Sequence, residues 1–132
     1  MDFTLNIYDR LLKTFLEHGY TFITFAEYMK LVSTNSLPDR FVILRHDVDN
    51  KPQNSAAFSE LQASYGIAGT YYFRIVPSSF DEEKIQKIAD RGHEIGYHYE
   101  TMDSCAGRLD QAYQEFLDNL ATFQKLVSVQ SI

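Results

Sequence analysis

The first third of the chain carries apolar residues at helical spacing. One run has side chains at i, i+3, i+4 and i+7, a pattern that predicts an amphipathic helix ending near Gly19. Its members are Tyr8, Leu11, Leu12 and Phe15. A short extended piece follows at residues 20–23. Thr24 and Glu27 then form a capping-box pattern, which predicts a second helix that runs to about Val32.

Beyond a polar break at residues 34–39, short β-rich runs alternate with helical runs. The β-rich runs lie at residues 41–44, 70–75 and 94–99. Their starts are 29 and 24 residues apart, close to the roughly 30-residue βαβ unit. The run 41–44 is continuously apolar, as is typical of a parallel strand covered on both faces. Helices are expected from Pro52 to Gly66, from the capping box of Ser79 and Glu82 to Gly92, and from Leu109 to Val127.

These alternating elements predict an α/β protein with about three to four parallel strands and their helices, preceded by an N-terminal helical segment. We place that segment at residues 1–38 and the α/β portion at residues 39–132. The α/β portion holds about three βα units, whereas a closed eight-stranded barrel takes ~250 residues. The end of the chain, residues 126–132, is typical of the start of a further strand.

The composition of the chain limits its domain number, its partners and its compartment. The 132 residues are 45% apolar and 14% aromatic, which is enough for a buried core in one domain. A formal charge of −6 makes nucleic acid and anionic membranes poor partners. A lone cysteine, Cys105, has no internal disulfide partner, and the N-terminus lacks a signal-peptide pattern. We therefore expect a cytoplasmic protein.

Charged and imidazole side chains gather where two predicted strands end. Because side chains alternate along a strand, Asp47 and Asp49 point to the same side, and so do His98 and Glu100. Carboxyl ends of parallel strands meet at one rim, where ligands bind in α/β proteins. Two carboxylates from one strand and a His–Glu pair from another suit Zn²⁺, Mn²⁺ or Co²⁺. One carboxylate can ligate while the other acts as general base.

Each feature also has a structural interpretation. An Asp-x-Asp at a strand end often caps the following helix, and a lone histidine such as His93 is more often structural than catalytic. Arg74 can clamp a substrate carboxylate or pair with Asp47. The many tyrosines favour core and rim packing. Cys105 has no adjacent base, which argues against a nucleophile.

Three segments together resemble a known family. They read FVILRHDVDN, GTYYFR and RGHEIGYHYE, in that order. This combination is similar to the polysaccharide deacetylase (NodB homology) family, also called carbohydrate esterase family 4, over residues 41 to about 127. The resemblance implies a distorted (β/α) barrel, of which this chain holds part, and a hydrolase that uses Zn²⁺, Co²⁺ or Mn²⁺ to cleave the amide of an acylated amino sugar. It implies Asp47 as catalytic base and Asp49 and His98 as metal ligands.

The chain departs from the family at one ligand. The family's second motif is His-x-x-x-His, but the position four after His98 holds Met102, a poor ligand for such a site. Glu100, His46 or a histidine on a later strand would have to replace it. The family's later motifs would fall beyond residue 132, so we expect a truncated chain that binds metal weakly. The substrate is expected to be a carbohydrate or another small amide.

Two rival functions follow. In the first, the chain is a catalytically inactive fragment or binding module, in which an open sheet edge and apolar faces lead to self-association. In the second, Asp47 and Asp49 form an Asp-x-Asp that binds a nucleotide-sugar through Mg²⁺ or Mn²⁺, as in a glycosyltransferase. No glycine-rich phosphate loop precedes the first helix of the α/β portion, which disfavours the second rival.

Overall fold

A four-stranded parallel sheet forms the centre of the protein. The computed structural model describes residues 4–132, so that residues 1–3 of the expected N-terminal segment lie outside the described residues. The strand order is β3-β4-β5-β6, and the bounds are β3 Arg45–Val48, β4 Thr70–Phe73, β5 Glu94–Tyr97 and β6 Val129–Ser131. The predicted α/β class with parallel strands is confirmed, as is the strand at the end of the chain. Within residues 4–132 the sheet is open, with β3 and β6 at its edges.

The first predicted strand differs from the expectation in one respect. A separate two-stranded sheet pairs β1, Thr21–Phe22, with β2, Phe41–Val42, in parallel. The prediction of one continuous strand at 41–44 is therefore wrong. The backbone changes partner there, because Ile23 N donates to Val42 O at 3.1 Å whereas Thr70 N donates to Leu44 O at 2.8 Å. The main sheet begins only after this exchange.

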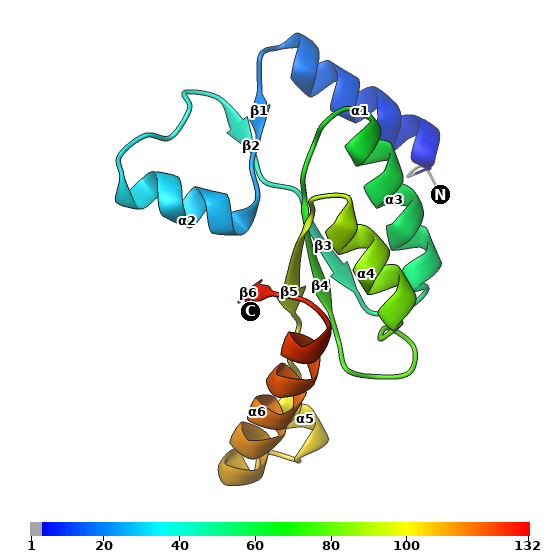
Figure 1. Cartoon of the computed structure of the whole chain (residues 1–132), viewed down its shortest axis with the longest axis vertical. Helices are drawn as coiled ribbons and strands as arrows, with labels where there is room; N and C mark the ends of the chain where they lie inside the picture. Colours follow the sequence, from blue (N-terminus) through cyan, green and yellow to red (C-terminus); the bar gives the residue numbers. More distant parts are fainter. Residues whose placement is uncertain (1–3) are drawn as a thin grey trace.

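Six helices connect or precede the strands in the described part of the chain. Their bounds are α1 Leu5–Glu17, α2 Phe25–Ser33, α3 Pro52–Ser64, α4 Glu82–Asp90, α5 Thr101–Ser104 and α6 Leu109–Leu126. The capping box of Thr24 and Glu27 is present at the start of α2, as predicted. Figure 1 shows α1, α3 and α4 together on one side of the strands and α2 apart on the other. Among residues 4–132, no helix is both long enough and apolar enough to cross a bilayer.

The core lies between the main sheet and its helices. On the sheet it is made by alternate residues of β4 and β5, whose side chains all point toward the helices. The main members are Tyr71, Phe73, Ile95 and Tyr97 from the strands, Ile85 and Ile88 from α4, and Phe123 from α6. The alternation of buried aromatic and aliphatic residues fixes which face each strand turns to the helices.

The N-terminal segment is held to the sheet by a buried carboxylate. Glu94 accepts a hydrogen bond from Ala26 N at 2.8 Å and another from Thr70 Oγ1 at 3.1 Å. Thr70 Oγ1 in turn accepts one from Phe25 N at 3.0 Å. A carboxylate is favoured at the N-terminus of a helix because the first amides there lack helical partners. Glu94 therefore links α2 to β4 and β5.

The second face of the sheet depends on a glycine. The Tyr72 ring lies across Gly96 on the neighbouring strand, and a Cβ added at Gly96 would come within 2.4 Å of Tyr72 Cε1. The missing side chain therefore lets a buried tyrosine cover β5.

Gly96→Ala should destabilise the protein by about 1–3 kcal/mol, because the new methyl group overpacks against Tyr72. The free energy of unfolding in urea measures the loss. The double variant with Tyr72→Leu is the control, since the smaller side chain makes room for the methyl group. An equal loss in both backgrounds would mean that the tyrosine ring is not the obstacle.

Candidate metal site

The register of three strands places polar side chains in one row. Val48, Phe73 and Tyr97 are paired across β3, β4 and β5, and the residues that follow them are Asp49, Arg74 and His98. The pairing continues past the strand ends, since His98 N donates to Phe73 O at 2.9 Å. The carboxyl ends of the strands therefore meet at one rim, as expected.

Three side chains at this rim converge. Asp49, His98 and Glu100 each offer one ligand atom, and these atoms lie within 4.8 Å of one another. Ligands at ~2.1 Å around a tetrahedral ion are roughly 3.4 Å apart, so the three atoms would have to move closer together to share one ion. The cluster joins Asp49 and His98, the two ligands expected from the resemblance, with Glu100, one of the replacements considered for the missing histidine.

The histidine of this cluster has an unused ring nitrogen. Nδ1 of His98 is buried and, within residues 4–132, has no hydrogen-bond partner. Asp49 Oδ1 lies 3.5 Å away, but the contact does not have hydrogen-bond geometry. A buried polar atom without a partner is costly, and a bound cation would satisfy it together with the two carboxylates. A donor set of one imidazole and two carboxylates can hold a metal ion.

Asp47, the expected base, lies outside this cluster. It is two residues before Asp49 on the same face of β3, and its carboxylate pairs with Arg45 Nε at 2.9 Å. The Arg45 guanidinium also lies over the Tyr72 ring, 4.3 Å from its centroid. The Asp47 and Arg45 side chains are each about half exposed. They lie on the open face of the sheet, which is the face opposite the core. The Asp47 carboxylate is therefore not one of the three candidate metal ligands.

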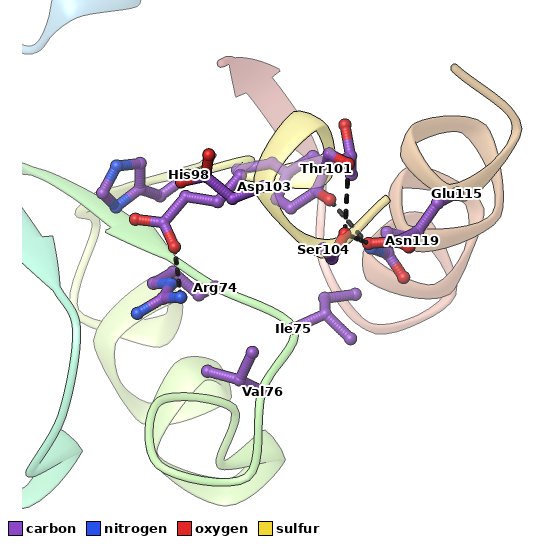
Figure 2. Close-up of a pocket in the computed structure, with 11 residues that line it drawn as sticks. Arg74, Ile75, Val76, His98, Thr101, Asp103, Ser104, Glu115 and Asn119 are labelled. Carbon is purple, nitrogen blue, oxygen red and sulfur yellow. Dashed lines mark hydrogen bonds and ion pairs between the residues drawn. The ribbon is translucent and has the colours of Figure 1, made fainter. Parts of the chain in front are cut away.

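A pocket adjoins the cluster. Its volume is about 200 Å³, and its lining comes from the ends of β4 and β5 and from α5 and α6. Figure 2 shows Arg74 and His98 on one side of it and Glu115 and Asn119 across from them. Sequence reasoning missed these α6 residues, although their i, i+4 spacing places them on the same side of a helix.

Arg74 has a partner that the sequence analysis did not consider. Its guanidinium forms an ion pair with the Glu100 carboxylate, rather than with Asp47 as one interpretation had it. Glu100 therefore belongs both to the cluster and to this ion pair. The other interpretation of Arg74, a clamp for a substrate carboxylate, stays a prediction.

His46 lies on the opposite face, away from the cluster. Its ring stacks on Tyr71 at 4.4 Å between centroids, and its Nε2 accepts from Gln62 Nε2 at 2.7 Å. The orientation of the Gln62 amide follows from Tyr71, whose hydroxyl donates to Gln62 Oε1 at 2.8 Å. Burial, together with repulsion from His93, lowers the pKa of His46 to about 4. The structure therefore does not bring this candidate ligand to the site.

The remaining candidates have structural roles. Both ring nitrogens of His93 are used, Nδ1 accepting from Gly69 N at 3.0 Å and Nε2 donating to Ser59 O at 2.9 Å, so the structural interpretation is confirmed. Cys105 is buried, and desolvation raises the pKa of its thiol, which disfavours the nucleophilic thiolate. Met102, in place of the family's second histidine, is half exposed on α5 and lines a separate apolar groove.

Comparisons of the chain with protein-family models, with curated proteins and with solved structures give no match.

Stability should fall as the pH is lowered from 6.5 to 4. The folded-state pKa of His46 lies below its ordinary value of 6.5, so the unfolded chain binds more protons in this window. The stabilisation from neutral His46 is fully present above pH 6.5, and up to roughly 3 kcal/mol is lost by pH 4. His93, whose pKa burial also lowers, acts with the same sign.

His46→Phe should flatten this dependence, measured as urea unfolding free energy against pH. Phe58→Leu is the matched control, because Phe58 packs against His46 but does not titrate. It should keep the slope of the parent protein. An unchanged slope in His46→Phe would mean that another group controls the dependence.

Proposed function

We propose that the protein is a metal-dependent hydrolase of the polysaccharide deacetylase type, which cleaves the amide C–N bond of an acylated amino sugar. The observation that carries the proposal is the convergence of Asp49, His98 and Glu100 within 4.8 Å. Among their atoms is the buried Nδ1 of His98, which has no hydrogen-bond partner within residues 4–132. The resemblance of the three sequence segments to that family supports the same chemistry.

In this proposal the metal ligands and the general base are different residues. Asp49, His98 and Glu100 would hold the divalent ion, which when bound would supply Lewis acidity toward water and toward an amide carbonyl. Asp47 is the proton acceptor for the attacking water, since its carboxylate lies on the same face but outside the ligand cluster. The C–O bond to the acyl carbon forms, the C–N bond breaks, and the amine nitrogen takes up a proton. The products are a carboxylate and an amine.

The pocket beside the cluster suits a small hydroxyl-rich group. At about 200 Å³ it is smaller than the roughly 300–1,000 Å³ typical of drug-sized ligands. Thr101, Ser104 and Asn119 line it together with carboxylates, and these groups exchange hydrogen bonds with sugar hydroxyls. One acylated sugar unit is therefore the substrate we favour.

Metal titration tests the ligand assignment. Calorimetry with Zn²⁺ and Co²⁺ should show weak binding by the parent protein, because one of its three ligands is already ion-paired. His98→Ala should abolish binding, since it removes the only nitrogen ligand of the cluster. Asp47→Asn should bind like the parent but lose any release of acetate from N-acetylglucosamine oligomers.

The two variants also show which assignment is wrong. Parent-like binding by His98→Ala would place the ion elsewhere. Loss of binding in Asp47→Asn would mean that Asp47 and Asp49 have exchanged roles. Because binding requires deprotonated ligands, affinity should also fall as the pH drops through the ordinary imidazole range near ~6.5.

A second candidate function is a binding module that self-associates. The observation that favours it is an apolar groove of about 250 Å³ beside the edge strand β6. Five of the apolar or aromatic side chains that line it are more than 40% exposed, and they are Tyr99, Met102, Leu109, Tyr113 and Ile132. An unpaired strand edge next to such a patch favours contact between copies of the chain.

Light scattering at tens of micromolar should then detect dimers or larger species. Leu109→Ser with Tyr113→Ser should shift the protein toward the monomer, because both side chains are exposed and their loss leaves the core intact. A doubly substituted α1 face, Leu11→Ser with Leu16→Ser, serves as the control. A monomeric parent protein would contradict the proposal of a self-associating binding module.

A further inference from the structure

Glu100 takes part in two incompatible arrangements. It is one of the three side chains that can share a divalent ion, and its carboxylate is at the same time ion-paired with the Arg74 guanidinium. A carboxylate that coordinates an ion with its facing oxygen cannot keep a tight guanidinium contact without placing two cations side by side. The two positive groups therefore oppose each other at this residue.

The charges around the pocket explain why Arg74 occupies this position. Among the residues that line the pocket, three carry carboxylates, namely Glu100, Asp103 and Glu115, and Arg74 is the only lysine or arginine. Glu115 is satisfied separately, by Ser104 Oγ at 2.6 Å and by Cys105 Sγ at 3.3 Å. Arg74 consequently compensates Glu100, the one pocket carboxylate that also belongs to the cluster.

The ion pair between Arg74 and Glu100 is partly exposed to solvent. The Arg74 side chain is 27% exposed and that of Glu100 is 40% exposed, so water can replace either partner as they separate. Ion pairs with this much exposure are weak. By contrast, Nδ1 of His98 is buried and has no hydrogen-bond partner within residues 4–132, so an entering cation would give it one.

We propose that Arg74 is a built-in competitor of the divalent ion, which holds Glu100 until the ion displaces the guanidinium. The inference rests on the proposed metal site and adds the regulation of its affinity. Arg74 then keeps the empty cluster from repelling itself and lowers the affinity of the site, so that the ion exchanges readily. It is a positioning residue, since it acts through Glu100.

Calorimetric titration with Mn²⁺ of the parent and of Arg74→Gln tests the competition. Removing the guanidinium frees Glu100, and the variant should bind Mn²⁺ about tenfold more tightly than the parent. Arg74→Lys keeps a positive charge at the same position and should stay within about threefold of the parent. Thermal melts of the variants verify that each is folded. Equal or weaker binding by Arg74→Gln would overturn the proposal.

A double-mutant cycle separates competition from simple charge repulsion. In a Glu100→Gln background, Arg74→Gln should gain less than about threefold, because the carboxylate for which the two cations compete is gone. A full tenfold gain in that background would overturn the proposal, since Arg74 would then act only through its charge on Asp49 and His98.

The result is distinguishable from the fate of the hydrolase proposal. A tighter Arg74→Gln together with no acetate release by any folded variant would leave the competition standing and remove the deacetylase activity. No Mn²⁺ binding by either the parent or Arg74→Gln would overturn both. If His98→Ala still bound Mn²⁺ with the affinity of the parent, the ion would lie outside this cluster, and the competition for Glu100 would be wrong as well.

Discussion

The in-register parallel pairing of β3, β4 and β5 is the constraint on which the site depends. It carries Asp49, Arg74 and His98 to the same level at the carboxyl ends of their strands. A slip of β5 by one residue would turn His98 toward the helices and bring Tyr97 to the open face. Burial of Tyr97 against Phe123 opposes that slip, so the core packing on one face fixes the polar cluster on the other.

Much of the site follows from local periodicity alone. Alternation along a strand predicts Asp49 on the side of Asp47, and the βαβ rhythm predicts that the two strand ends meet at one rim. Glu100 lies beyond the end of β5, at the N-cap of α5, so alternation alone does not account for its place beside His98. The same alternation separates His46 from Asp47, which was a usable signal against His46 as a ligand. Residue type alone makes His46 a plausible ligand, whereas its position in the alternation does not.

Local periodicity does not predict which strands pair with each other or which distant side chains form ion pairs. The apolar run at 41–44 has the composition of one strand, yet its first half pairs with β1 and the carbonyl of Leu44 pairs with β4. Which strand lies alongside is decided by long-range geometry that no local pattern encodes. The Arg74–Glu100 pair is hidden for the same reason, because it joins the end of β4 to a residue beyond the end of β5.

His46 and His98 lie on opposite faces of the sheet, and they differ in whether a ring nitrogen has a hydrogen-bond partner. On the helix face, His46 Nε2 already accepts from the Gln62 amide, so a proton or an ion at that nitrogen would have to displace a donor. On the open face, His98 Nδ1 has no hydrogen-bond partner within residues 4–132, and the carboxylates of Asp49 and Glu100 stand beside it. A buried ring nitrogen with a committed donor stabilises the fold, whereas one left without a donor beside two anions is prepared for a cation. Strand alternation thus produces a structural histidine and a candidate ligand from the same residue type.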